Sequence, residues 1–356
     1  MFGPRPPETS AAARSDLAAC RASLRNGSKT FLAASLLLPR GVHEPASALY
    51  AFCRLADDAV DGPDGRHGAV ARLRERLSLA YAGTPQPHAA DRALAAVVAR
   101  HGIPSALFDA LLEGFEWDTL GRRYDTLDDL HDYAARVAGT VGAMMALLMG
   151  VRSPEGLARA CDLGVAMQLS NIARDVGEDA RMGRLYLPRQ WMREAGLDPD
   201  AWLAQPLFSP ALGSVVQRVL DAAELLYQRV DAGVARLPLA CRPGINAARF
   251  MYAEIGHEVA RRGLDSVNAR ARVSGRRKAW LLLRSVAQLA PAAGTQPLPP
   301  LRANRFLVEA AAERVDTPPR RGVVDRVVWT FELFARLEQR ERVRVANRSS
   351  GADLAA

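Results

Sequence analysis

The apolar residues of this 356-residue chain recur every three or four positions, and no other feature constrains its fold as strongly. That period places apolar side chains on one face of an α-helix. Alternating Val, Ile and Thr runs bounded by hairpin turns, which would indicate strands, are scarce. We therefore predict an all-α fold with many helices. The residues that show the period best are Val70, Leu73, Leu77, Leu107, Leu111 and Phe115.

Glycine and proline interrupt this pattern and divide the chain. Residues 1–15 carry Pro and Ser without apolar periodicity, and we expect them to be disordered. One domain is predicted for 16–290, followed by a Pro-rich linker at 291–322. Residues 323–356 are predicted to form an amphipathic helix (323–345) and a tail. This helix is expected to pack on the domain, with a role at a membrane surface as the alternative.

The charge balance is basic, with a formal net charge of +8, but only two of the 47 basic residues, Lys29 and Lys278, are lysines. Such an arginine skew is typical of biased genome composition, so basicity alone is weak evidence for an anionic partner. The arginines are dispersed and aromatic residues make up only 6%, which argues against a nucleic-acid interface. The cysteines and histidines are scattered and show no zinc-site spacing.

The N-terminal residues 1–14 contain no apolar stretch of the kind found in a signal peptide. The longest apolar run, at 140–151, is about a dozen residues, short of the roughly 18 needed to span a bilayer. We therefore expect a cytoplasmic protein.

A first acidic motif lies at 50–61, YAFCRLADDAVD. On a helix, Tyr50, Arg54, Asp57 and Asp61 follow one another at spacings of four, three and four, so they share one face. Two carboxylates at i and i+4 repel each other by a few tenths of a kcal/mol, which favours a neutralising cation. Magnesium prefers such oxygen ligands and leaves room for phosphate oxygens. A solvated acidic face is the alternative for this motif alone.

A second motif at 168–179, QLSNIARDVGED, repeats the arrangement. Gln168, Asn171, Asp175 and Asp179 again share one face, now inside an otherwise apolar helix. A polar stripe in such surroundings costs desolvation unless something satisfies it, and metal with diphosphate would do so. Two such helices facing each other would line a cavity in which bridging magnesium ions bind diphosphate and help its carbon–oxygen bond to ionise. Arginines could hold the remaining phosphate charge.

Four segments resemble one known family. They are GSKTF at 27–31, YAFCRLADDAVD at 50–61, YAARVAGTVG at 133–142 and QLSNIARDVGEDARMGRLYLP at 168–188. The last is long and highly specific. Over roughly residues 20–285 the chain resembles the squalene/phytoene synthase family, and within that family it most resembles the bacterial phytoene synthases.

The resemblance implies a single-domain isoprenoid (terpenoid) synthase fold with a central cavity between two Asp-bearing helices. It also implies magnesium dependence, with manganese as a substitute, and no use of NADPH. The implied reaction is the head-to-head condensation of two geranylgeranyl diphosphates to phytoene through a cyclopropylcarbinyl diphosphate, with release of diphosphate. Squalene or dehydrosqualene synthesis from farnesyl diphosphate is the alternative, and a non-catalytic family relative acting as an assembly factor is a remote one.

The resemblance also implies roles for individual residues. Tyr252 is implied to reach the diphosphate and, with the four aspartates, to be catalytic. The match of Arg270 needs a one-residue shift, and Gly27 stands where some members have His. The residues implied to hold the metal are Asp57, Asp61, Asn171, Asp175 and Asp179. The residues implied to bind the substrate are Ser28, Lys29, Phe31, Tyr50, Arg54, Val137, Val141, Gly142, Gln168, Asn171 and Arg270.

The prenyl chains would lie in a tunnel lined by Phe31, Val137, Val141, Gly142 and Leu148. Helix packing alone is the alternative for Val137, Val141 and Leu148, because they recur at helical spacing. Glycine within a helix is less favourable than alanine by roughly 1 kcal/mol, so Gly142 indicates a close approach by a prenyl chain or by another helix. Because the substrate and the product are both hydrophobic, we further expect contact with the inner membrane face and with downstream carotenoid enzymes.

Overall fold

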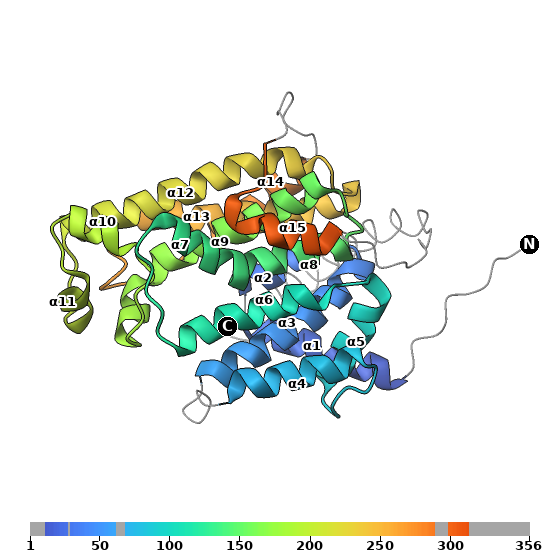
Figure 1. The fold of residues 1–356 in the computed structure, drawn as a ribbon. Coiled ribbons are helices and arrows are strands. Elements are labelled where there is room, and N and C mark those ends of the chain that lie inside the picture. The colour runs from blue at the N-terminus through green and yellow to red at the C-terminus, as the bar shows by residue number, and fades with distance from the viewer. Residues whose placement is uncertain (1–10, 28, 62–67, 289–297, 313–356) are drawn as a thin grey trace, which may run out of the picture. The chain divides into compact units, whose positions relative to one another are not determined.

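The computed structural model describes residues 11–27, 29–61, 68–288 and 298–312, all of which belong to one compact unit. Among these residues every regular element is helical, as the apolar period predicts, and no strand occurs (Figure 1). The α-helices are α1 (Ala11–Gly27), α2 (Lys29–Ser35), α3 (Arg40–Asp61), α4 (Ala69–Tyr81), α5 (Ala89–His101), α6 (Ser105–Thr119), α7 (Leu127–Ala134), α8 (Thr140–Leu148), α9 (Pro154–Arg181), α10 (Arg189–Glu194), α11 (Pro199–Ala204), α12 (Pro210–Val234), α13 (Arg242–Arg261), α14 (Gly275–Ala287) and α15 (Arg305–Ala312). A π-helix, η1 (Ala135–Gly139), and two 3₁₀ turns, η2 (Leu239–Cys241) and η3 (Arg302–Asn304), complete the set.

Helix ends coincide with the signals in the sequence. α9 begins after Ser153, whose side chain accepts a hydrogen bond from the Gly156 N–H, and Pro154 occupies the first turn. Thr126 and Asp129 form a reciprocal capping box at the start of α7. α5 ends at Gly102, which adopts the left-handed conformation (φ 58°) that favours glycine at this position.

The N-terminal helix begins earlier than expected. Residues 11–15 are helical, although the sequence pattern assigned them to a disordered stretch. The helix is held on the domain because Asp16, Cys20 and Leu24 are buried along one side of it. Arg92 of α5 donates two hydrogen bonds to the Asp16 carboxylate, from Nε to Oδ2 at 2.9 Å and from Nη2 to Oδ1 at 2.6 Å.

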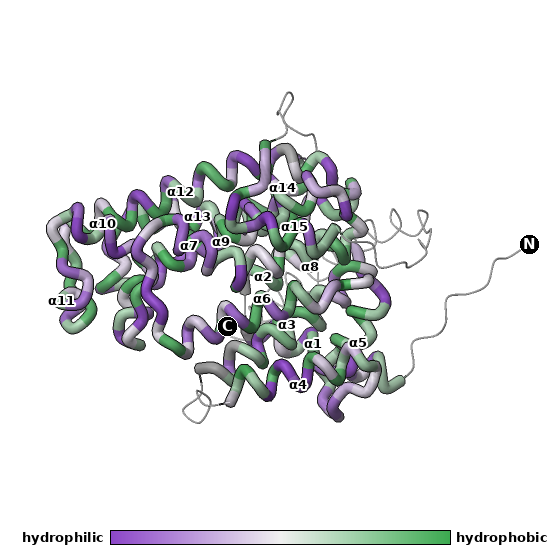
Figure 2. The backbone as a smooth tube through the Cα atoms, in the orientation of Figure 1, coloured by the Kyte–Doolittle hydropathy of each residue, from purple (hydrophilic) through white to green (hydrophobic). Residues whose placement is uncertain are grey.

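Helix α9 is the hub of the unit. It packs most extensively on α12, and it also contacts α8, η1, α13 and α15. The first motif helix, α3, packs on a different set: α1, α5, α4, α8 and α6. The two Asp-bearing helices therefore lie in separate layers that α8 joins. Along α12, hydrophobic and hydrophilic residues alternate, as expected of a helix with one face on the core (Figure 2).

Glycines allow the backbones next to α9 to approach it closely. A Cβ atom on Gly142 would lie 2.1 Å from the Ala160 carbonyl oxygen, and one on Gly164 would lie 2.2 Å from that of Ala138. Both contacts are too short for any side chain, so α8 and η1 rest directly on the α9 backbone. Helix packing thus accounts for the glycine at 142, and a prenyl contact at this residue stays a prediction.

The segment predicted as a linker is partly folded. Within 291–322, residues 302–312 form η3 and α15, and the side chains of Leu307, Val308 and Ala311 are buried against the body. The prolines before this segment suggested an extended linker, but the apolar spacing of these three residues outweighs that signal. The helix predicted at 323–345 lies outside the described residues. No described helix is long and apolar enough to cross a membrane.

Asp162 holds this C-terminal segment on α9. Its carboxylate is fully buried and accepts hydrogen bonds from Arg229 Nε (2.9 Å) and Asn304 Nδ2 (2.9 Å). Arg159 Nη2 lies 3.1 Å from the same carboxylate. Both arginines also donate to the Pro299 carbonyl, at 3.0 and 2.6 Å, so one cluster fixes residues 299–304 to α9 and α12.

Asp162→Ala should lower the free energy of unfolding by about 3 kcal/mol, because it leaves two guanidinium groups without their buried partner. Denaturant titration measures the loss. Asp221→Ala, at an exposed carboxylate of α12, is the control and should change stability by less than about 0.5 kcal/mol. Equal losses in the two variants would contradict the anchoring role.

Candidate active site

The second motif forms the polar stripe that its spacing predicts. Gln168, Asn171, Asp175 and Asp179 are all partly buried on α9. The residues between them, including Leu169, Ile172, Ala173 and Val176, are buried in the core. The amide oxygen of Asn171 is buried and has no hydrogen-bond partner among the described residues. An unsatisfied buried oxygen is costly, so this atom is suited to accept from a ligand or to bind a cation.

Asp175 is held by two arginines. Arg174 Nε donates to Asp175 Oδ1 at 2.7 Å, and its Nη2 donates to Oδ2. Arg270, from the loop between α13 and α14, places Nε 2.8 Å from Oδ1 and donates from Nη2 to Oδ2 at 3.1 Å. Its Nη1 also lies 3.2 Å from Glu178. The structure thus brings Arg270 to the second motif, and its expected contact with a diphosphate stays a prediction.

Tyr252 belongs to the same cluster. It is partly buried on α13, a neighbour of α9. Burial lowers the pKa of Arg174, but the hydrogen bond and charge of Asp175, with a smaller contribution from Tyr252, outweigh it and raise that pKa overall. Arg174 therefore remains a cation beside Asp175, with the Tyr252 phenol nearby.

Asp179 is less well compensated than Asp175. Burial and, secondarily, the negative charge of Asp175 raise its pKa to about 7. Arg184 opposes this shift, whereas Asp118 and Glu178 add to it. A carboxyl whose charge is this costly in the folded chain is a strong candidate for a cation ligand, because a cation would offset both causes.

The first motif lies in the last turns of α3. Arg54 binds Asp58, with Nη2 2.6 Å from Oδ1 and a hydrogen bond from Nε to Oδ2 at 3.2 Å. Asp57 and Asp61 are helical residues of α3, but their side chains lie outside the described atoms, as does the side chain of Lys29. Residue 28 is also outside the described residues, so its predicted contact stays a prediction.

Tyr50 explains the glycine at position 27. The rings of Tyr50 and Phe31 stack with centroids 5.6 Å apart. A Cβ atom on Gly27 would lie 2.1 Å from the Tyr50 hydroxyl, so any side chain at 27 would displace this ring. The position that the Tyr50 ring takes therefore requires glycine at position 27.

The predicted tunnel residues differ in exposure. Leu148 is buried in the core, whereas Val137 and Val141 are partly buried beside it. Val137 packs on Gly114 of α6, where an added Cβ would lie 2.6 Å from its Cγ1. Both valines are thus partly exposed, and the contact of Val137, Val141 and Leu148 with a prenyl chain stays a prediction.

Comparison with known proteins decides the family. The pattern of the squalene/phytoene synthase family matches residues 24–277. The chain belongs to the squalene/phytoene synthase family. All four segments that suggested this resemblance lie inside the matched range.

Several family members are closely similar in sequence. A phytoene synthase of Cereibacter sphaeroides is 50% identical over 95% of this chain and 99% of its own length. A phytoene synthase of Rhodobacter capsulatus is 50% identical over 88% of this chain and 94% of its own. Among solved structures, a dehydrosqualene synthase in complex with ligand is 31% identical and superposes with a TM-score of 0.71, covering 78% of this chain and 97% of that one. The expected isoprenoid synthase fold is confirmed.

An aromatic and acidic cluster that no sequence motif predicts lies beside the second motif. Asp118 of α6 accepts hydrogen bonds from Tyr133 (2.9 Å) and Tyr186 (2.7 Å), whose rings stack 5.0 Å apart. Tyr124 stacks on Tyr186, with centroids 6.0 Å apart. Both Asp118 partners lie in segments quoted for the resemblance, but Asp118 itself follows no spacing rule. Its effect on the pKa of Asp179 places it near the stripe.

Asp179→Asn should stabilise the protein in a pH-dependent way. Because the folded-state pKa is raised, protonation of Asp179 stabilises the fold fully below its ordinary pKa of 3.8, and this stabilisation is lost as pH rises through about 7. In EDTA we expect the variant to raise the free energy of unfolding by about 1–3 kcal/mol at pH 8 and to change it little near pH 4.

Denaturant titrations at both pH values measure this difference. Asp221→Asn, at an exposed carboxylate, is the control and should show no such pH dependence. A stability change of Asp179→Asn that is the same at pH 4 and pH 8 would rule out the elevated pKa.

Proposed function

We propose that this chain is a phytoene synthase, which joins two geranylgeranyl diphosphates head to head and releases diphosphate. The observation that carries the proposal is the α9 stripe of paired carboxylates with two arginines, in a chain that is 50% identical to relatives named phytoene synthase. A prenyltransferase needs this combination, because its leaving group is a multiply charged diphosphate.

The residues proposed to hold magnesium are Asp57, Asp61, Asn171, Asp175 and Asp179, and manganese would substitute for it. Among the described side chains no three carboxylates, histidines or cysteines form a metal-ligand group by themselves. The donors on α9 nevertheless fit a hard cation: Asn171 offers an unsatisfied buried oxygen, and Asp179 an oxygen whose charge is costly. When bound, the metal neutralises charge on the leaving diphosphate.

The chain's own cations would share the diphosphate. Arg174 and Arg270 present forked donors to the Asp175 carboxylate, and the same donors suit phosphate oxygens. Tyr252 lies near Arg174, and its hydroxyl would donate a hydrogen bond to the diphosphate. The remaining proposed contacts are Ser28, Lys29, Tyr50, Arg54 and Gln168.

The reaction needs a dry apolar space for two reactive cations. The carbon–oxygen bond of one donor breaks and releases diphosphate, leaving an allylic cation. The double bond of the second donor attacks this cation, and loss of a proton closes the ring of a cyclopropylcarbinyl diphosphate. This intermediate loses its own diphosphate, rearranges and releases a proton to give phytoene. Val137 and Val141 would contact the prenyl chains and exclude water, while the Phe31 face would stabilise nearby positive charge.

Two alternatives concern the donor and the chemistry. The similarity to a solved dehydrosqualene synthase keeps farnesyl diphosphate as the rival donor, since the four aspartates do not report chain length. Squalene synthesis would add a nicotinamide reduction, which we do not expect here. A non-catalytic assembly factor would have lost acids from the motifs, and both aspartate pairs are present.

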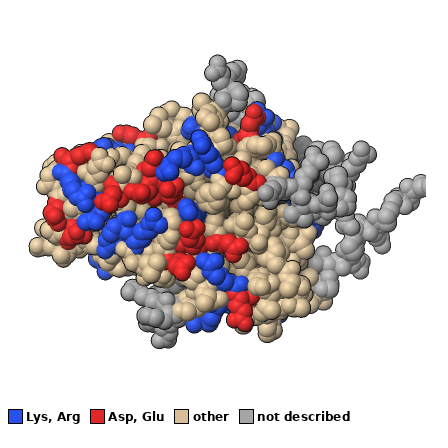
Figure 3. Space-filling model, viewed as in Figure 1, with Lys and Arg blue, Asp and Glu red and all other residues tan. Residues whose placement is uncertain are grey.

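Location and partners also stay predictions: a cytoplasmic protein at the inner membrane face, in contact with downstream carotenoid enzymes. Nucleic acid is not an expected partner. On the face in Figure 3, basic and acidic side chains of the described residues are interspersed rather than gathered in one basic patch.

Purified protein incubated with Mg²⁺ and geranylgeranyl diphosphate, without nicotinamide, should yield a C40 hydrocarbon that organic solvent extracts. Chromatography with mass detection identifies it. A parallel incubation with farnesyl diphosphate is the control for donor length. A C30 product formed only from the shorter donor would move the assignment to dehydrosqualene synthase, and the absence of any hydrocarbon would refute the proposed reaction.

Asp61→Asn and Asp175→Asn should each abolish turnover while helix content stays unchanged. At Asp175 the amide also loses the charge that pairs with two arginines, so we expect stability to fall by about 1–2 kcal/mol. Activity and circular dichroism measure the two effects. If either variant keeps most of its activity, the metal-site assignment of that motif is wrong.

A further inference from the structure

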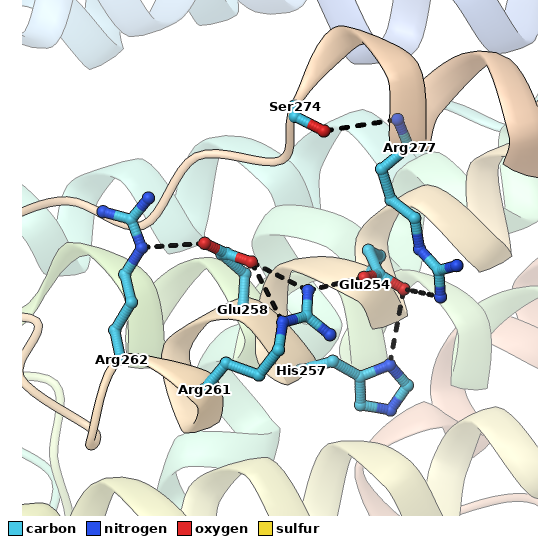
Figure 4. A network of polar contacts seen from close by, with 7 residues as sticks. All are labelled: Glu254, His257, Glu258, Arg261, Arg262, Ser274 and Arg277. Atoms are coloured by element: carbon cyan, nitrogen blue, oxygen red, sulfur yellow. Dashed lines mark hydrogen bonds and ion pairs between the residues drawn. The ribbon is translucent and has the colours of Figure 1, made fainter.

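The loop that carries Arg270 is anchored at both ends. It runs from Arg262 to Ser274, between α13 and α14. Glu254 of α13, which is only 2% exposed, binds Arg261 at 2.6 Å and Arg277 at 2.9 Å, as Figure 4 shows. Arg261 ends α13 and Arg277 lies in the first turn of α14, so one buried carboxylate fixes the positions at which the loop leaves and rejoins the helices.

The first half of the loop has a defined conformation. Leu264 adopts a left-handed backbone (φ 66°), which a leucine takes only where the surroundings impose it. Asp265 then caps the turn: its Oδ1 accepts hydrogen bonds from the backbone N–H groups of Val267 (3.1 Å) and Asn268 (3.0 Å). The Asn268 side chain binds Oδ2 at 2.8 Å.

The turn docks on α9 at a glycine. The Gly177 N–H donates to the Ser266 carbonyl at 3.0 Å. A Cβ atom on Gly177 would lie 2.2 Å from the Val267 carbonyl oxygen and 2.7 Å from its Cα, so any side chain would push the loop backbone away. Val267 and Ala271 are buried on either side of the exposed Arg270.

We propose that Gly177, with the turn capped by Asp265, positions Arg270 on the diphosphate side of Asp175. Gly177 lies between Asp175 and Glu178, the two carboxylates that Arg270 binds. Gly177, which receives the loop, and the two carboxylates that bind its arginine therefore lie within a single turn of one helix, so a shift of the loop at Gly177 displaces Arg270. The proposal rests on the function proposed above, because it gives Arg270 its ligand.

Gly177→Ala tests the docking. In a free helix this change stabilises, but here it should loosen the loop. We expect faster amide hydrogen exchange in peptides covering 264–272, together with about tenfold weaker binding of inorganic diphosphate in the presence of Mg²⁺. Gly41→Ala is the matched control, since Gly41 is also helical and an added Cβ there meets nothing within 4 Å. It should change neither measurement.

A double-mutant comparison shows whether the effect passes through Arg270. In an Arg270→Ala background, Gly177→Ala should cause no further loss of diphosphate affinity, because the group it positions is gone. Asp265→Ala should reproduce the loss, whereas Asp265→Asn should largely restore binding, since its Oδ1 still accepts both backbone N–H groups. The two Asp265 variants also decide the question if Gly177→Ala does not fold.

Unchanged exchange and affinity in Gly177→Ala would overturn the proposal. So would a loss that persists in full when Arg270 is already alanine, because Gly177 would then act by another route. A wild-type protein that binds no diphosphate would instead refute the proposed function and the ligand of Arg270. The exchange comparison would still decide whether Gly177 holds the loop.

Discussion

The close approach of neighbouring backbones to α9 is the constraint on which the rest of the structure depends. At Gly142, Gly164 and Gly177 a single added carbon would collide with a carbonyl group of a neighbouring segment. These contacts place α8, η1 and the loop after α13 at fixed distances from the helix that carries the second motif. A site built on such an element is held more firmly than one built on a loop, because packed backbones cannot shift independently.

This rigid frame has an electrostatic consequence. The stripe on α9 holds carboxylates where water is largely excluded, and the frame does not let them move apart. Asp175 is compensated by Arg174 and Arg270, whereas the charge of Arg184 does not offset the burial of Asp179, so the charge of Asp179 is costly in the folded chain. Two neighbouring carboxyls with different environments are a common preparation for binding a charged ligand, since the ligand then supplies the missing compensation.

Much of this arrangement could be predicted from residues near one another in sequence. Spacing alone predicts that Gln168, Asn171, Asp175 and Asp179 share a face, and capping residues predict where α7 and α9 begin. What could not be predicted depends on distant pairings. Asp118 accepts a hydrogen bond from Tyr186, which lies 68 positions away in the sequence. Gly177 is needed because the backbone of Val267, 90 positions further along, packs against it. The boundary errors at 11–15 and 302–312 have the same cause, since Asp16 and Asn304 are held by partners that only the fold supplies.

The cluster around Asp162 shows that the folded domain extends beyond the segment that matches the family pattern. The family pattern ends at residue 277, yet Leu307, Val308 and Ala311 cover part of α9, α8 and α6. A chain cut where the shared pattern stops would expose that apolar surface and leave Asp162 without its Asn304 partner. In this protein the segment that matches the family pattern is therefore shorter than the folded unit, which among the described residues extends to Ala312.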